Sequence, residues 1–157
     1  MKCNYVRVLK SDWTRENCAV GGTLAIVGER WTLLVLREAF LGVRRFEQLQ
    51  RHTGMARNIL SDRLSTLVAH GILEREPYQE RPQRHEYRLT EKGLDLYPVL
   101  LTLMDWGARH LDGEAMTLQH KSCGAVAMPH LACPECGEAA RARDMRAVRE
   151  EALPRSA

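Results

Sequence analysis

The sequence predicts a mainly α-helical, α+β fold with one small β-hairpin, the architecture of a winged helix-turn-helix. Three observations support this prediction. Two helical segments, over 44–53 and 56–70, are joined by a tight turn at Thr53-Gly54. After Gly71 the apolar residues take the spacing of two short strands, and a long helical segment follows the strands.

Three helices are expected before this pair, over 11–17, 18–28 and 31–40. Ser11-Asp12 is suited to cap the first of them. Apolar residues recur every three or four positions in the other two, as on the buried face of a helix. Gly42 is placed to end the third.

The second helix of the pair has a core face and a polar face. An apolar stripe forms the core face and consists of Leu60, Leu64, Leu67 and Val68. Gly71 supplies the residue that can adopt a left-handed conformation where the helix ends. This helix can therefore pack on a core while its opposite face meets a ligand.

The two strands are expected over 72–78 and 85–89, with a tip at 79–84 between them. Pro82 restricts the conformations of the tip, which also carries Arg81 and Arg84. A hairpin in this place after a helix-turn-helix is a wing.

A long helix begins after its cap, Thr90, and reaches about residue 111, with a kink or break near 95–96 caused by Pro98. It is apolar on more than one face and so has more surface to bury than its own domain offers. We expect a homodimer through the terminal helices. The expected interface residues are Leu94, Tyr97, Leu101 and Met104. Burial against the first two helices is the alternative, and both can hold.

The composition is that of a globular protein, since 45% of the 157 residues are hydrophobic and 27% are charged. No apolar run approaches the roughly 18 residues that a membrane-spanning helix needs, and residues 1–10 do not resemble a signal peptide. We therefore expect a cytoplasmic protein without a membrane partner.

Positive charge is concentrated on the helix pair. Against Glu47 and Asp62, the segment 44–63 contains five arginines, namely Arg44, Arg45, Arg51, Arg57 and Arg63. Such an excess suits a phosphate backbone. On charge alone, an ordinary solvated surface is the alternative.

Several blocks of sequence resemble the HxlR-type family of winged helix-turn-helix transcriptional regulators, a MarR-like group. The blocks are Cys18, VGERWTLLVLRE at 27–38, RRFEQL at 44–49, RNILSDRL at 57–64, ERP at 80–82 and YRLTEKG at 87–93. Together they span roughly residues 18–110. The resemblance implies a homodimer that binds a pseudo-palindromic operator in double-stranded DNA and represses or activates transcription.

In a helix-turn-helix, the N-terminal half of the second helix reads base edges, while the first helix crosses the backbone. The base-reading candidates are Met55, Ala56, Arg57, Asn58 and Ser61. Arginine suits guanine, asparagine suits adenine, and the methionine could touch a thymine methyl group. The phosphate candidates are Arg44, Arg45, Arg51 and Arg63, and the tip residues Arg81 and Arg84 are expected at the minor groove or its phosphates. For each residue alone, an ordinary surface position is the alternative.

Cys18 begins the second expected helix, where the positive end of the helix dipole favours a thiolate. Its position matches a cysteine with which some members of the resembled family sense oxidants or electrophiles. A small buried residue in the dimer interface is the alternative, and Cys3 is a conceivable disulfide partner.

The remaining cysteines form a pattern with one histidine near the C-terminus. His120-x2-Cys123 and Cys133-x2-Cys136 are separated by nine residues, and a glycine follows each pair. The paired spacing resembles a small zinc ribbon and predicts one structural zinc ion per chain, bound by His120, Cys123, Cys133 and Cys136. His130 is an alternative nitrogen ligand. The alternative to a metal site is an empty hairpin with an oxidation-prone Cys133–Cys136 pair.

These predictions divide the chain into a winged-helix and dimerisation domain over 1–112, a Cys/His-rich extension over 113–140 and an Arg-rich tail over 141–157. The leading function is DNA-binding regulation under redox or ligand control, although no residue set indicates an effector. A protein-interaction module with a zinc-binding docking lobe is the alternative. No enzymatic activity is expected, because no nucleophile–base pair is evident and the four metal ligands leave no open position.

Overall fold

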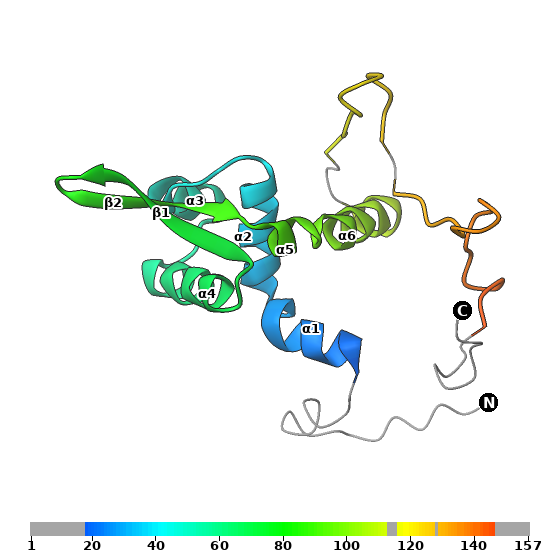
Figure 1. The fold of residues 1–157 in the computed structure, drawn as a ribbon, viewed down its shortest axis with the longest axis horizontal. Coiled ribbons are helices and arrows are strands. Elements are labelled where there is room, and N and C mark those ends of the chain that lie inside the picture. Colours follow the sequence, from blue (N-terminus) through cyan, green and yellow to red (C-terminus); the bar gives the residue numbers. More distant parts are fainter. Residues whose placement is uncertain (1–17, 113–115, 128, 147–157) are drawn as a thin grey trace, which may run out of the picture. The chain divides into compact units, whose positions relative to one another are not determined.

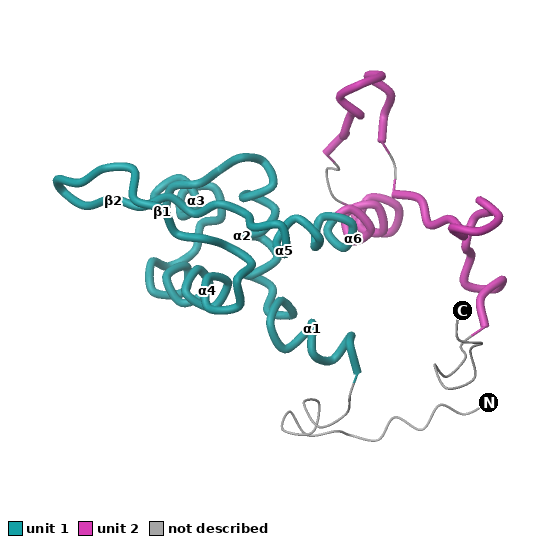
Figure 2. The backbone as a smooth tube through the Cα atoms, viewed as in Figure 1, with its two compact units in different colours: residues 1–100 teal, residues 101–157 magenta. Residues whose placement is uncertain are grey.

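The computed structural model describes residues 18–112, 116–127 and 129–146 (Figure 1). By its internal contacts the chain divides into two compact units, residues 1–100 and residues 101–157 (Figure 2). The helix expected over 11–17 and Cys3 lie outside the described residues. The three-part division made from the sequence stays a prediction.

Two helices precede the helix-turn-helix, as expected. Helix α1 spans Ala19–Val27, and the thiol of its N-cap Cys18 accepts a hydrogen bond from the backbone N–H of Gly21. Helix α2 spans Arg30–Phe40 and begins at the carboxylate of Glu29, which accepts a 2.8 Å hydrogen bond from the N–H of Trp31. Each cap satisfies one of the N–H groups that a helix start leaves without an internal partner.

The helix-turn-helix consists of α3, Phe46–Thr53, and α4, Arg57–Ala69. Gly54 ends α3 with φ of 68°, and Gly71 follows α4 with φ of 65°. Both angles lie in the left-handed region, which glycine adopts without the steric cost that a Cβ would add. The two turns expected from these glycines are confirmed.

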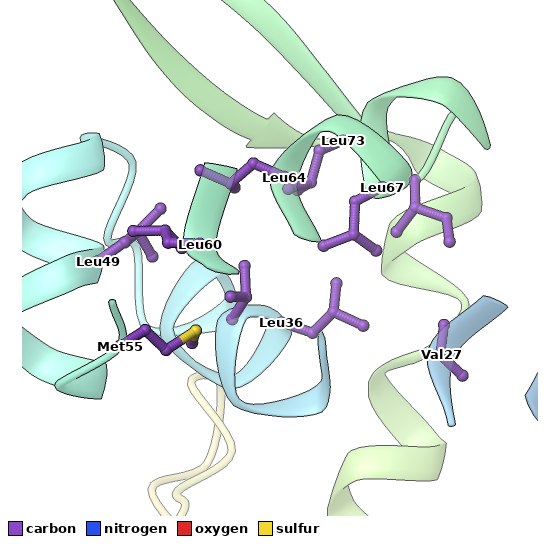
Figure 3. Close-up of a cluster of buried hydrophobic side chains, with 10 residues drawn as sticks. Val27, Leu36, Leu49, Met55, Leu60, Leu64, Leu67 and Leu73 are labelled. Atoms are coloured by element: carbon purple, nitrogen blue, oxygen red, sulfur yellow. The ribbon is translucent and has the colours of Figure 1, made fainter. Parts of the chain in front are cut away.

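One cluster of apolar side chains joins these helices (Figure 3). Its buried members are Val27, Val35, Leu36, Leu49, Met55, Leu60, Leu64, Leu67, Ile72 and Leu73. The predicted stripe on α4 supplies three of them, and Val68 is half-buried beside them. Because α4 buries this side, its opposite side is left for solvent or a ligand.

The hairpin strands reach closer to the tip than the sequence predicts. Strand β1 spans Leu73–Glu80 and β2 spans Gln83–Leu89, and they pair antiparallel. Glu80 pairs with Gln83, so the turn is only Arg81-Pro82. The register shifts between Pro77 and Gln79. This irregularity lets the ladder continue past a proline, which has no N–H to donate.

The helical segment after the hairpin is broken at the expected place. Helix α5, Glu91–Leu94, is followed by α6, Tyr97–His110, with Asp95 and Leu96 between them. The Thr90 hydroxyl caps α5 by accepting from the N–H of Gly93 at 3.1 Å. A Cβ on Gly93 would lie 2.2 Å from the carbonyl oxygen of Ile72, so only glycine fits between α5 and the start of the hairpin.

No single described helix is both long and apolar enough to cross a membrane, although α1 and α2 together, bent by 80° at their junction, meet the length and composition test.

Candidate nucleic-acid interface

The solvent side of α4 brings three predicted base-reading residues together. Arg57, Asn58 and Ser61 are exposed and line a shallow hollow together with Phe46, the first residue of α3. All three lie in the first five residues of α4, which is the part of a recognition helix that meets base edges. The structure therefore assembles donors and acceptors on the side of α4 that faces away from the core.

Arg57 is held by an aromatic ring. Its Cζ lies over the ring of Phe46 at 4.8 Å from the centroid, a cation–π contact between the two helices. Phe46 was not among the site residues predicted from the sequence. Its position at the start of the first helix, beside the arginines, was the available signal.

The prediction for Met55 was wrong. Its side chain is only 3% exposed and belongs to the core cluster, with Leu49 and Leu60 (Figure 3). Met55 lies in the turn before α4, where the chain passes inward, so its thioether cannot reach a thymine methyl group. Ala56, the next residue, is exposed.

The arginines expected to hold phosphate differ in their surroundings. Arg44, Arg45 and Arg51 are exposed, and no acidic side chain among the described residues forms an ion pair with them. Arg63 is different, because it is partly buried and pairs with the neighbouring carboxylate of Asp62. The first three are therefore the freer cations for a phosphate backbone.

The segment before α3 attaches the wing to the helix-turn-helix. The N–H of Tyr87 donates a 2.8 Å hydrogen bond to the carbonyl of Arg44, and Arg45 forms a β-bridge with Glu86. The guanidinium of Arg45 also lies over the ring of Tyr78, 4.5 Å from the centroid. Tyr78 is a second residue of this surface that was not predicted from the sequence, and it falls at the register irregularity of the hairpin.

The wing itself presents basic side chains. Arg81 in the turn and Arg84 beside it are exposed, and neither has an ion-pair partner within the described part of the chain. By contrast, Arg88 near the base of the hairpin is paired with Glu76 and Glu86. The cations at the tip are thus available for a ligand, while the one at the base is occupied within the hairpin.

A buried carboxylate links α2 to α3 behind this surface. Glu38 is 4% exposed and contacts Nδ1 of His52 at 2.8 Å and the guanidinium of Arg37 at 2.7 Å. Burial raises the pKa of Glu38, but hydrogen bonds and charge from His52 and Arg37 outweigh it, so the pKa lies below its ordinary 4.5. Glu38 is therefore held as a carboxylate that fastens the first helix of the pair.

The residues predicted for dimerisation lie in the last two helices. Leu94 and Tyr97 are exposed and Leu101 and Met104 are half-buried. The Tyr97 ring packs against that of Phe40 from α2, with 4.9 Å between centroids. Leu103 and Trp106, which were not predicted for the interface, are 50% and 52% exposed. The dimer stays a prediction.

The predicted zinc ligands are found in two places. Nδ1 of His120 lies 3.4 Å from the sulfur of Cys123, and the Cys133 thiol interacts with that of Cys136. Within the described residues, no three His, Cys, Asp or Glu side chains gather in a group that could hold a metal ion. Cys18 is exposed at the start of α1.

Known proteins agree with this architecture. Residues 26–115 match the model of the HxlR-like helix-turn-helix family, which is more than half of the chain. The chain belongs to the HxlR-like helix-turn-helix family.

The HxlR-like relatives are regulators of transcription. An HTH-type transcriptional regulator of Mycobacterium tuberculosis strain H37Rv is 51% identical over 133 residues, which are 83% of this chain and 84% of the relative. The HTH-type transcriptional regulator YdeP of Bacillus subtilis is 35% identical over 98 residues, or 62% of this chain and 77% of YdeP. The chain is thus a helix-turn-helix transcriptional regulator, for which the family implies DNA binding.

Solved structures show the same fold. The proposed transcription factor PA1607 has a TM-score of 0.78 and 33% identity, over 89% of this chain and 99% of its own. The oxidised form of the redox regulator HypR has a TM-score of 0.57 and 33% identity, over 61% of this chain and 100% of HypR. The 133-residue match to the mycobacterial relative is longer than residues 1–115, so that similarity reaches into the Cys/His-rich segment.

Proposed function

We propose that this HxlR-like regulator acts in the cytoplasm and binds a pseudo-palindromic operator as a homodimer, with α4 of each protomer in the major groove. Helix α3 crosses the phosphate backbone, and the tip of the wing reaches the adjacent minor groove. The observation that carries this proposal is the exposed group Arg57, Asn58 and Ser61 at the start of α4. Arginine and asparagine can each make paired hydrogen bonds to one base, guanine and adenine respectively.

The starts of both helices support the proposed orientation. Neither Arg45, the N-cap of α3, nor Ala56, the N-cap of α4, forms a side-chain capping hydrogen bond within the described residues. The first backbone N–H groups of these helices are therefore available to phosphate oxygens, which the helix dipole also favours. Arg44, just before α3, and Arg51, within α3, add exposed cations beside these helix starts.

Homodimerisation is proposed through the last helix. Leu101 and Met104 occupy the predicted side of α6, and none of the α6 residues whose burial is described is fully buried. A second copy of the chain would cover these apolar side chains and place two α4 helices on two half-sites. Because a symmetric dimer has a twofold axis, the two half-sites that it contacts should be related by the same symmetry, and the operator is therefore pseudo-palindromic.

Cys18 is the proposed point of redox control. Its thiol is exposed and lies at the N-terminus of α1. The structurally similar HypR is a redox regulator by name. Treatment with peroxide should change the operator affinity of the native chain and should leave the operator affinity of Cys18→Ser unchanged. An equal response of both proteins would exclude Cys18 as the sensor.

The decisive experiment first selects bound fragments from the source genome and then measures affinity for the selected operator and for random DNA. Arg57→Ala should lose about 1–3 kcal/mol on the operator, with relaxed preference at one base pair. Arg57→Lys keeps the charge without the bidentate fork, so it should retain random-DNA affinity and lose discrimination. Arg30→Ala is a matched control, because Arg30 also lies over an aromatic ring, that of Trp31, but on α2.

Equal losses on operator and random DNA in Arg57→Ala would assign Arg57 to the backbone and contradict the proposed reading role. Binding that does not weaken with rising salt would contradict the DNA-binding role of the whole surface and favour a protein-interaction module.

A further inference from the structure

The Cys/His-rich segment contains two hairpins with the same backbone hydrogen bonds. In the first, the N–H of His120 donates to Ala125, that of Gly124 to His120, and that of Ala127 to Leu118, at 2.7–2.9 Å. In the second, the N–H of Cys133 donates to Glu138, that of Gly137 to Cys133, and that of Ala140 to Leu131, each at 2.8 Å. We call them the His120 knuckle (118–127) and the Cys133 knuckle (131–140).

The equivalence extends to the turn and to the side chains. Gly124 and Gly137 occupy the same place in the two knuckles, with φ of 69° and 73°. Each knuckle has one β-bridge, Gln119 with Val126 and Ala132 with Ala139. In this alignment His120 corresponds to Cys133, and Cys123 corresponds to Cys136. The two residue pairs that can bind a metal therefore occupy equivalent positions on one repeated backbone.

The distance within the His120 knuckle fits a metal ion. Zinc–nitrogen bonds of about 2.05 Å and zinc–sulfur bonds of about 2.3 Å at a tetrahedral angle put the two ligand atoms roughly 3.6 Å apart. Nδ1 of His120 and Sγ of Cys123 are 3.4 Å apart. The Ser122 hydroxyl also lies 2.9 Å from this nitrogen, so a bound ion would replace one hydrogen bond.

The Cys133 knuckle brings its two thiols together. The sulfur of Cys133 accepts hydrogen bonds from the backbone N–H groups of Cys136 and Glu135 and also interacts with the Cys136 thiol. A set of three sulfurs and one imidazole nitrogen is typical of a structural zinc site.

We propose that the two knuckles together bind one zinc ion, through Nδ1 of His120 and the sulfurs of Cys123, Cys133 and Cys136. Each knuckle supplies one preformed pair of ligands, and the ion joins the pairs. Nine residues separate Cys123 from Cys133, and only three of them, 128–130, lie between the two knuckles, so the two ligand pairs are close neighbours along the chain. Binding releases up to three thiol protons and changes no oxidation state.

The test uses the full chain, purified without chelators under reducing conditions, and measures bound metals together with free thiols. One zinc per chain is expected. Cys133→Ser should lose it, whereas Cys18→Ser, the control for a thiol outside the knuckles, should keep it. His120→Asn and His130→Asn form a matched pair, and only the first should weaken zinc binding. Cobalt in place of zinc should give the absorption of a tetrahedral thiolate complex, and that absorption should diminish in Cys123→Ser.

A structural readout complements the metal content. Lys121 lies inside the His120 knuckle, between its two ligands, so we expect a zinc ion that fixes the knuckle to slow cleavage by trypsin there. The zinc-loaded chain should resist cleavage after Lys121, and a chelator should remove that resistance. Zinc well below one per chain, a different metal, a Cys133–Cys136 disulfide in the purified chain, or metal loss in His130→Asn instead of His120→Asn would each overturn the proposal. None of these results depends on whether the chain binds an operator.

Discussion

The guanidinium of Arg57, on α4, lies over the ring of Phe46, the first residue of α3, with Cζ 4.8 Å from the ring centroid. The contact joins the helix proposed to read bases with the helix proposed to cross the backbone. An arginine side chain loses considerable rotamer freedom when it is fixed, so a ring that already holds it lowers the entropic cost of contacting a base.

Phe46→Leu should therefore weaken operator binding through Arg57. The variant keeps an apolar side chain against the core and removes the ring, and we expect a loss of about 0.5–1 kcal/mol, or roughly two- to fivefold in affinity. The effect should be absent when Arg57→Ala is already present, as a double-mutant cycle by fluorescence anisotropy would show. Strictly additive losses would mean that the two residues act independently.

Neutralising the wing tip should change salt dependence more than sequence preference. The double variant Arg81→Gln/Arg84→Gln removes two exposed cations, and each lost phosphate contact should lower the slope of log K against log salt by about 1. Arg88→Gln is the matched control, since Arg88 is paired with Glu76 and Glu86 and should leave the slope unchanged. A changed order of preferred operators in the double variant would instead assign base reading to the wing.

The burial of Met55 predicts a stability defect. Met55→Ala should lower the free energy of unfolding by about 2–5 kcal/mol because it leaves a cavity beside Leu49 and Leu60. Met55→Leu nearly conserves volume and should cost less than about 1.5 kcal/mol, with unchanged base preference. Denaturant unfolding and operator selection measure the two quantities. Altered base preference in the stable Met55→Leu variant would contradict a purely structural role for Met55.

Periodicity predicted the described helices and the hairpin, because each of these elements has a strong local signal. The α4 stripe, the glycines after α3 and α4, and Pro98 near the break in the last helix each act through the backbone or one helix face. The turn of the wing is shorter than predicted from the sequence. The two strands go on pairing beyond the irregularity at Tyr78, between Pro77 and Gln79, and this pairing depends on the partner strand. Strand pairing is a tertiary property that local pattern does not contain.

The candidate site was predicted by residue type but not by contact. Arg57, Asn58 and Ser61 follow from their place at the start of α4. The prediction for Met55 was wrong because the direction of a side chain in a turn depends on how the backbone enters the next helix. The rings of Phe46 and Tyr78 were missed because cation–π contacts join residues far apart in sequence, at spacings that no periodic pattern marks.

Glu38 should make stability depend on pH in the acid range. Its folded pKa is lowered, so the carboxylate stabilises the fold above the unfolded value near 4.5, and this contribution is lost as pH falls below that value through the folded pKa. Glu38→Gln should cost about 1–3 kcal/mol at pH 7 and show a shallower loss of stability on acidification. Glu47→Gln, at an exposed carboxylate of α3, is the control. Denaturant unfolding from pH 5 to pH 3 measures the free energy of unfolding of both proteins. Parallel curves for Glu38→Gln and the native chain would contradict the role of Glu38.

Charge placed on the predicted side of α6 should dissociate the proposed dimer. Leu101 and Met104 are three residues apart and share one side of the helix, so Leu101→Lys would bury an ammonium group in an apolar interface. Light scattering should give the mass of two chains for the native protein and of one chain for the variant. Arg109→Gln, which removes only the solvent-exposed partner of Asp105, should leave the mass unchanged.

The same measurement distinguishes two possible interfaces on α6. Leu103 and Trp106 are also three residues apart and, at about 100° per residue, lie on a different side of the helix from Leu101. They are more exposed than Leu101 and Met104. If Trp106→Lys gives single chains while Leu101→Lys stays dimeric, the interface lies on the Leu103/Trp106 side and the residues predicted from the sequence are incorrect. A monomeric variant should still bind one half-site, with the weaker affinity of a single α4, because dimerisation supplies the second half-site without altering the first.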